Sequence, residues 1–253
     1  MYGEKIVFDG NSSRKPARTP ANPVVHVRPG QDWIRGRCAA AECPIASPEV
    51  MVRGSLQRQL GGYREDLPHT GDLEMWLRFA AHGSIARLAD SDQAYYRQHP
   101  LNMHRTAFGT TIKSLEQLEA CFDIFFAEHG RELPDAERLR RMARIALAAK
   151  AVHRLIGGLL HLGCPLTAGE AGRLWEFAIR CRPDQPGFGS RGSRTNLAAI
   201  GWAAHAGLTG VLISLYVNNS ALRKAAAPAL RALGRQPAWE HPRISVEAQC
   251  DQS

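Results

Sequence analysis

The sequence predicts an α/β protein in which residues 1–107 combine a mixed sheet with helices and residues 108–253 are all-α. Short apolar runs bounded by glycine, proline and aspartate recur up to His99, as is typical of strands and loops. From Thr110 onward, apolar residues repeat with helical spacing over longer segments. A chain of 253 residues, 44% of them hydrophobic, is long enough for one large domain or two modest ones with buried cores.

The first sixty residues predict short elements separated by a long connection. Residues 5–8 (KIVF) form a predicted strand that ends in a turn at Gly10. Residues 11–30 carry four prolines and predict a loop. The further predictions are one or two turns of helix over 33–38, a short buried strand over 49–52, and a short helix over 55–60. Gly61 is placed to end that helix in a left-handed conformation.

The stretch 61–99 contains a predicted helix between two glycines. Asp72 is placed to cap or open this helix, which runs to about His82 and stops at Gly83. One apolar face is predicted from residues at i, i+3, i+4 and i+7, namely Leu73, Trp76, Leu77 and Ala80. Two strands follow, over 85–88 and 93–98, with a turn predicted at Asp90-Ser91-Asp92 between them.

Three amphipathic helices are predicted beyond residue 110, the second over about 135–160 and the third over 167–181. Residues 184–194 read as a linker, and a basic helix is predicted over 220–233. Residues 197–217 lack Asp, Glu, Lys and Arg and approach the length that spans a bilayer. Three interpretations stay open for them: a buried helix of a soluble bundle, an interfacial helix, or a membrane span.

Charge and cysteine usage restrict the partners and the compartment. The net charge of +8 and a pI of about 9.5 favour an anionic partner, such as a nucleotide, a phosphate-bearing substrate or a membrane surface. No DNA- or RNA-binding motif is present, so a nucleic-acid partner is not expected. The six cysteines have no zinc-binding spacing and no targeting peptide precedes them, which predicts a reducing, cytoplasmic location. The basic C-terminal part adds an expected peripheral membrane contact.

Four segments follow one another in a recognisable order. The first runs from Pro44-Ile45 to residues 51–53, the second is Gly61-Gly62-Tyr63 followed by acidic residues, and the third is GDLEMWLR over 71–78. The fourth is Tyr96-Arg97-Gln98-His99 with Asn102 three residues on. Together they resemble the C-terminal half of the catalytic domain of family 2 glycosyltransferases, which have the GT-A fold. The order of the four segments makes the resemblance specific.

The resemblance implies roles for seven residues. Asp72 matches the general base that deprotonates the acceptor hydroxyl in an inverting transfer from a nucleotide-sugar, and Glu74 is the second-choice base. A helix N-terminus is expected to keep such a carboxylate ionised. The expected acceptor-binding residues are Gly61, Gly62, Arg78 and Arg97. His99 is the expected ligand of a divalent ion, Mg²⁺ or Mn²⁺, that neutralises the diphosphate leaving group.

Each of these residues also has a purely structural interpretation. Asp72 would then be a plain helix N-cap, His99 a hydrogen-bonded residue at a strand end, and the glycine pair an ordinary helix stop. Trp76 is expected to belong to the core. Arg78 is expected to pair with a nearby carboxylate or with the acceptor, or to be solvated.

The family's donor-binding half, with its D-x-D motif after an apolar strand, is not found in this sequence. Asp90-Ser91-Asp92 matches the letters but follows the Asp72 helix, which is the wrong order. The expectation is therefore an incomplete GT-A domain that acts on a glycan or lipid-linked acceptor, and binds its divalent ion, only when the donor half is supplied. The alternative hypothesis is a non-catalytic helical interaction or membrane-docking protein derived from such an enzyme.

Overall fold

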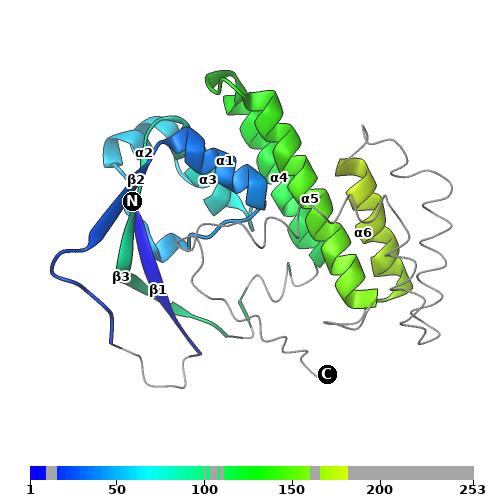
Figure 1. The fold of residues 1–253 in the computed structure, drawn as a ribbon, viewed down its shortest axis with the longest axis horizontal. Helices are drawn as coiled ribbons and strands as arrows, with labels where there is room; N and C mark the ends of the chain where they lie inside the picture. Colours follow the sequence, from blue (N-terminus) through cyan, green and yellow to red (C-terminus); the bar gives the residue numbers. More distant parts are fainter. Residues whose placement is uncertain (10–15, 100, 103–107, 109–110, 160–165, 182–253) are drawn as a thin grey trace. The chain divides into compact units, whose positions relative to one another are not determined.

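The computed structural model describes residues 1–9, 16–99, 101–102, 108, 111–159 and 166–181. These residues form a three-stranded mixed sheet, six α-helices and two short 3₁₀ helices, which confirms the predicted α/β class (Figure 1). The chain divides into two compact units between Ala143 and Arg144. All three described strands precede residue 107, so the predicted change from mixed to helical structure is present in the described part of the chain.

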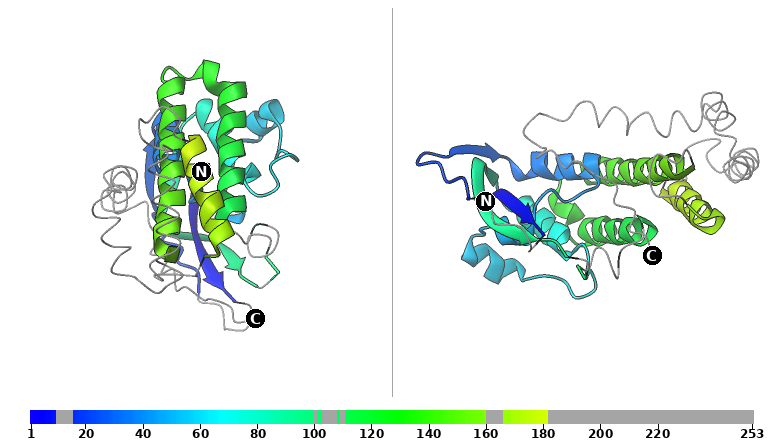
Figure 2. Two further views of the ribbon diagram at one scale, coloured as in Figure 1. Left: turned by 90° about the vertical axis from the view of Figure 1, so that its right-hand side faces the viewer. Right: turned by 90° about the horizontal axis from the view of Figure 1, so that it is seen from below.

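The sheet has β3 at its centre, with the strand order β1-β3-β2 (Figure 2). β1 (Tyr2–Phe8) runs parallel to β3 (Ile85–Arg97), and β2 (Val24–Arg28) runs antiparallel to it. β2 lies in the segment predicted as a loop, so that prediction was wrong for five residues. The surrounding prolines are typical of a loop, which is why the strand was not predicted. Four of its five side chains are exposed, so the strand also lacks the alternation of buried and exposed residues that a half-buried strand shows.

A second correction concerns the turn predicted at residues 90–92. The two predicted strands are one strand, β3, and Asp90 lies inside it with a positive φ of 55°. The register with β1 shifts here, as it does at a bulge. The backbone N–H of Arg18 donates to Asp92 at 2.7 Å, and the Arg18 guanidinium donates to both aspartates. The Asp-Ser-Asp letters therefore belong to a bulge that Arg18 stabilises.

Helix α3 (Gly71–Ala81) is the centre of the first unit's core. It packs against α1 (Gly30–Ala40), α2 (Gly54–Leu60) and α4 (Thr111–His129). The predicted apolar face is confirmed as buried, and Met75 and Phe79 on other faces are buried as well. The helix is therefore enclosed on nearly all sides, which gives its polar side chains few routes to solvent.

The strand predicted over 49–52 was wrong. Ser47–Glu49 is instead a 3₁₀ helix, η1, and Val50 forms only an isolated bridge to Tyr2. The Glu49 carboxylate accepts the N–H of Ala46 at 2.7 Å, which closes the 3₁₀ turn. A buried carboxylate that satisfies its own backbone favours a turn over a strand.

Two further helices match their predictions closely. α5 (Ala136–Leu159) begins after the 3₁₀ helix η2 (Gly130–Glu132), and α6 is Ala168–Cys181. In α6 the buried residues recur at helical spacing, namely Ala171, Leu174, Trp175, Phe177, Ala178 and Cys181. No helix within the described ranges is both long and apolar enough to cross a membrane. The predictions for 184–194, 197–217 and 220–233 lie outside the described residues.

Gly30, the first residue of α1, lies against the end of α3. A Cβ at this position would overlap the carbonyl oxygens of Ala80 and Gly83. We expect Gly30→Ala to lower the free energy of unfolding by about 1–3 kcal/mol, because the backbone of α3 or of α1 must move to make room for the Cβ. Gly54→Ala is the matched control: it also begins a helix, and its Cβ would meet only the flexible end of Arg58 at 3.4 Å. Urea denaturation of both variants checks this, and equal losses would contradict the packing described.

Candidate functional site

Asp72 is the second residue of α3, after the N-cap residue Thr70. Its Oδ1 accepts the N–H of the next residue, Leu73, at 2.7 Å. Asp72 therefore stands at N2 and not at the N-cap, so the plain N-cap interpretation is wrong in position, although the carboxylate accepts the N–H of N3 as a capping side chain does. Among residues 71–80, every side-chain position except 72 is buried, and Asp72 is half-buried. The first turn of α3 therefore presents one carboxylate at the boundary of the core.

Burial controls the electrostatics of this carboxylate. Burial raises the pKa of Asp72, and the backbone N–H donors of Leu73 and of Asp72 itself lower it by less. The helix N-terminus was expected to have the larger effect on the pKa of Asp72 and to lower it. That expectation was wrong, because burial has the larger effect and raises the pKa. Among the described residues no cation forms an ion pair with Asp72. The carboxylate therefore has no counter-ion beside it among the described residues.

Two thiols lie near Asp72, of the half-buried Cys43 and the buried Cys121. Burial raises the pKa of Cys43, and the negative charge of Asp72 raises it further. Burial likewise raises the pKa of Cys121, with Glu74 and Asp72 among the smaller causes. Both thiols are therefore protonated at neutral pH and are poor nucleophiles. Of the groups placed together here, the Asp72 carboxylate is the one able to accept a proton.

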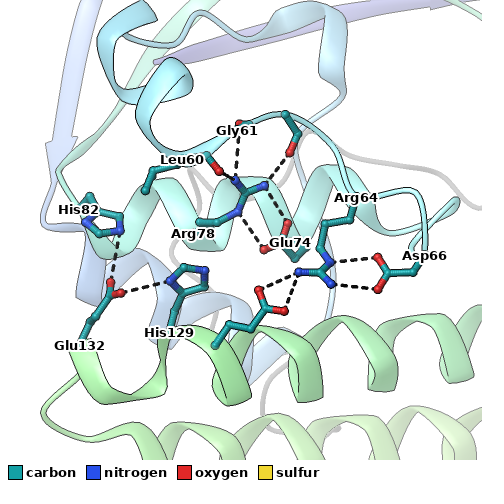
Figure 3. Close-up of polar contacts among 11 residues, drawn as sticks. Leu60, Gly61, Arg64, Asp66, Glu74, Arg78, His82, His129 and Glu132 are labelled. Atoms are coloured by element: carbon teal, nitrogen blue, oxygen red, sulfur yellow. Dashed lines mark hydrogen bonds and ion pairs between the residues drawn. The ribbon is translucent and has the colours of Figure 1, made fainter.

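Glu74 forms a buried ion pair and is not available as a base. Its side chain is 0% exposed, and its two oxygens accept Nε and Nη2 of Arg78 at 3.0 Å each (Figure 3). A base must reach the proton it removes, and this carboxylate is enclosed and fully engaged. The prediction of Glu74 as second-choice base is therefore wrong. Its i,i+4 spacing to Arg78 is the sequence signal for the pair.

Arg78 supports the glycine loop. In addition to Glu74, its guanidinium donates to the backbone carbonyls of Leu60, Gly61 and Gly62, the last at 2.7 Å (Figure 3). These contacts use all five N–H donors of an arginine side chain. Arg78 therefore has no donor left for an acceptor sugar, and the prediction that its side chain binds the acceptor is corrected. It holds the backbone of the loop that carries the predicted acceptor-binding glycines.

Gly61 needs the conformational freedom of glycine. It ends α2 with φ 86° and ψ −177°, a positive φ as predicted but with an extended ψ. Essentially only glycine adopts this region, and other residues pay about 1–3 kcal/mol there. The neighbouring Gly62 has no positive φ, and a Cβ on it would meet nothing within 4 Å. The backbone thus requires glycine at position 61 and is open to approach at position 62.

We expect Gly61→Ala to lower the free energy of unfolding by about 1–3 kcal/mol, because alanine is strained at this φ and ψ. Gly62→Ala, the matched control one residue on, is expected to change it by less than about 0.5 kcal/mol. Chemical denaturation of the two variants measures the difference. A loss for Gly62→Ala as large as that for Gly61→Ala would mean that the loop has a different conformation.

A second arginine, Arg64, fixes the other end of this loop. It donates to both oxygens of Asp66 at 2.9 Å and to both oxygens of Glu128 on α4 at 2.7 Å (Figure 3). Leu67, three residues on, is 1% exposed and anchors the loop in the core. No sequence pattern points to Arg64, because its partner Glu128 lies 64 residues away and no local spacing connects them.

Arg97 and His99 lie where β3 ends. Arg97 is exposed as the last residue of the strand, and the half-buried His99 follows it. The His99 carbonyl accepts the N–H of Asn102 at 3.0 Å, so this end of the motif forms a turn. Neither residue forms a hydrogen bond or ion pair with Asp72 among the described contacts. The group with metal-ligand spacing in the described chain contains His82, His129 and Glu132, and not His99.

A cavity of about 700 Å³ lies beside the other end of α3. Its lining includes Trp76 and Phe79 of α3, Leu56 of α2 and Ile85 of β3. Trp76 is 6% exposed, which confirms the prediction that it is a core residue. Asp72 does not line this cavity, so the carboxylate and the cavity are separate features.

Comparison of the chain with protein-family models, curated proteins and solved structures finds no match. Inference about function therefore depends on the chemistry of the residues themselves. Three features are available for it: the half-buried Asp72, the glycine loop that Arg78 and Arg64 hold in place, and the cavity beside the end of α3.

Proposed function

We propose that this chain carries the acceptor side of an inverting glycosyltransferase of the GT-A type, with Asp72 as the general base. In this reaction the acceptor hydroxyl oxygen bonds to the anomeric carbon of a nucleotide-sugar. The bond from that carbon to the nucleotide diphosphate breaks, and the hydroxyl proton passes to Asp72. The four ordered sequence segments motivate the proposal, and all the residues with proposed catalytic or acceptor roles lie between Gly61 and His99.

The observation that carries the proposal is the state of Asp72. A half-buried carboxylate with no ion-pair partner among the described residues costs stability, since burial disfavours its charge. Such groups concentrate at functional sites, where the same environment tunes them for chemistry. A raised pKa also makes the carboxylate a stronger base. General-base catalysis is most efficient when the pKa of the base lies near the working pH, and burial moves the pKa of Asp72 in that direction.

The loop at 61–62 supports an acceptor site of backbone groups. Arg78 of α3 binds the carbonyl of Gly62, and Arg64 joins the loop to Glu128 of α4. The loop is therefore held in place and needs little reorganisation when a sugar binds. The open space around Gly62 allows a sugar ring to approach the main chain. Arg97, exposed at the end of β3, is the side chain proposed to reach the acceptor, which is a glycan or a lipid-linked sugar.

The divalent ion expected from the resemblance does not fit the described residues. His99 does not belong to a group of three or more neighbouring His, Cys, Asp or Glu side chains in the described chain. No step of the reaction as proposed here is therefore assigned to Mg²⁺ or Mn²⁺. The ion stays a prediction for the donor half, as do the nucleotide-sugar donor and its binding residues. The net charge of +8 is compatible with an anionic donor.

The test joins the chain to its upstream coding sequence and measures transfer from a panel of nucleotide-sugars. Transfer or donor hydrolysis by the joined protein, with less or none by the chain alone, is the expected result. An apolar strand followed by D-x-D in the upstream sequence is expected with it. A joined protein that turns over none of the donors would favour the alternative, a non-catalytic interaction protein.

A further inference from the structure

Three side chains that the proposed transferase does not use meet at one corner of the first unit. His82 follows the last residue of α3, His129 is the last residue of α4, and Glu132 is the last residue of η2. His82 Nε2 lies 3.2 Å from Glu132 Oε2, and His129 Nδ1 lies 3.2 Å from Glu132 Oε1 (Figure 3). One possible ligand atom from each residue lies within 4.8 Å of the others.

We propose that His82, His129 and Glu132 bind a divalent transition-metal ion of the Zn²⁺ class. Two imidazoles and one carboxylate are a donor set that zinc takes in three-ligand sites. Ligand bonds of about 2.0–2.2 Å in a tetrahedral arrangement separate neighbouring ligand atoms by about 3.3–3.6 Å. The two nitrogen–oxygen separations of 3.2 Å, one to each oxygen of Glu132, are close to that distance, and one ligand atom from each residue lies within 4.8 Å of the others, so the three side chains are near enough to close on one ion.

The surrounding backbone favours a cation at this corner. The site lies at the C-terminal ends of both α3 and α4. The unpaired carbonyls at a helix C-terminus carry partial negative charge, which attracts positive charge within the last turn. Two helix ends and one carboxylate therefore all act in the same direction. The His129 ring also stacks on Phe125, with centroids 6.0 Å apart, which restricts the imidazole's orientation.

The ion would connect the end of α3 to the corner between α4 and η2. Three protein ligands leave a fourth position in a tetrahedral site, which water or a small ligand fills. His82 is one of the residues that line the 700 Å³ cavity, so the fourth position is near that cavity. The site uses neither Asp72 nor the glycine loop, and it can therefore be tested independently of the proposed transferase reaction.

The competing explanation is an ion pair without a metal, in which Glu132 accepts hydrogen bonds from two imidazoles. Exposed pairs of this kind contribute about 0–1 kcal/mol and need no ion. The side chains of His82 and Glu132 are 28% and 40% exposed, which permits either state. The two explanations differ in one measurable property, which is saturable binding of one ion per chain.

The experiment titrates the purified full chain with Co²⁺, whose visible absorption bands report the ligand set, and then displaces it with Zn²⁺. We expect one ion per chain and a spectrum of nitrogen and oxygen ligands. Loss of a direct ligand should cost more than loss of a supporting group, so His129→Ala and Glu132→Gln should each weaken binding by at least about 100-fold. His153→Ala is the matched control, because it removes an exposed histidine of α5 outside the cluster.

A second measurement keeps the result independent of how well each variant folds. The melting temperature of each protein is recorded with EDTA and with Zn²⁺, and only the wild type and His153→Ala should show a Zn²⁺-dependent rise. Absence of Co²⁺ bands in the wild type would overturn the proposal. So would bands that persist in Glu132→Gln and His129→Ala, or intense thiolate-to-metal charge-transfer bands, which would place the ion on cysteines.

Discussion

Replacing Glu74 with alanine is expected to lower the free energy of unfolding by about 3–5 kcal/mol. The substitution leaves the buried guanidinium of Arg78, whose side chain is 7% exposed, without its counter-ion in the core. It also releases the side chain that fixes the carbonyls of residues 60–62. Urea denaturation followed by circular dichroism measures the loss. Glu116→Ala on α4 is the control, because Glu116 is exposed, and its change should be within about 0.5 kcal/mol.

The paired variant separates the charge from the packing. Arg78→Met alone should be about as damaging as Glu74→Ala, because it leaves Glu74 charged and buried. The double variant Glu74→Leu, Arg78→Met should recover part of that loss, since an apolar pair removes both buried charges. Its remaining deficit reports the loop carbonyls that lose their donors. A Glu74→Ala variant that loses less than about 1 kcal/mol would contradict the buried pair.

Asp72→Asn is expected to reduce sugar transfer by about 10²–10⁴-fold, the contribution of a positioned general base. The amide is nearly the same size and can still accept the Leu73 N–H, but it cannot take the acceptor proton. In the wild type, the rate should fall as the pH decreases through the pKa of Asp72, because the protonated acid is no longer a base. Burial places that decrease above the pH of an ordinary aspartate.

The same substitution should not lower stability at pH 7. Because the folded-state pKa of Asp72 is raised, the folded state binds its proton more tightly than the unfolded state does. This contribution favours folding at low pH and is lost as the pH rises from the unfolded pKa through the folded one. At a pH above the folded-state pKa the charged carboxylate therefore opposes folding, and neutral asparagine removes that cost. Lower activity with equal or higher stability is the behaviour of a functional residue.

Sequence patterns predicted the elements that local periodicity controls. The apolar spacing of α3, α4, α5 and α6 is strong over eleven or more residues, and all four helices lie where expected. The errors are local elements that depend on distant residues. β2 exists because β3 lies beside it, and the bulge at Asp90 exists because Arg18 donates to both aspartates. Neither partner is close in sequence.

The candidate site shows the same division. Asp72 was identified from its place at a helix start, but whether helix dipole or burial controls its pKa depends on packing that the sequence does not contain. The sequence resemblance predicted Glu74 as a second-choice base and Arg78 as an acceptor-binding residue. In the structure they form a buried ion pair, because they are spaced i,i+4 on a helix that packs against three others. Arg64 with Glu128, and the corner of His82, His129 and Glu132, join segments that are distant in sequence.

The most direct test of the central claim, that Asp72 is the base, compares two matched substitutions in the chain joined to its upstream sequence. Asp72→Asn and Asp135→Asn each remove one carboxylate, and Asp135 is an exposed residue just before α5. Initial rates of sugar transfer are measured at saturating donor and acceptor. We expect a loss of about 10²–10⁴-fold for Asp72→Asn and an unchanged rate for Asp135→Asn. Transfer by Asp72→Asn at the wild-type rate would contradict the claim.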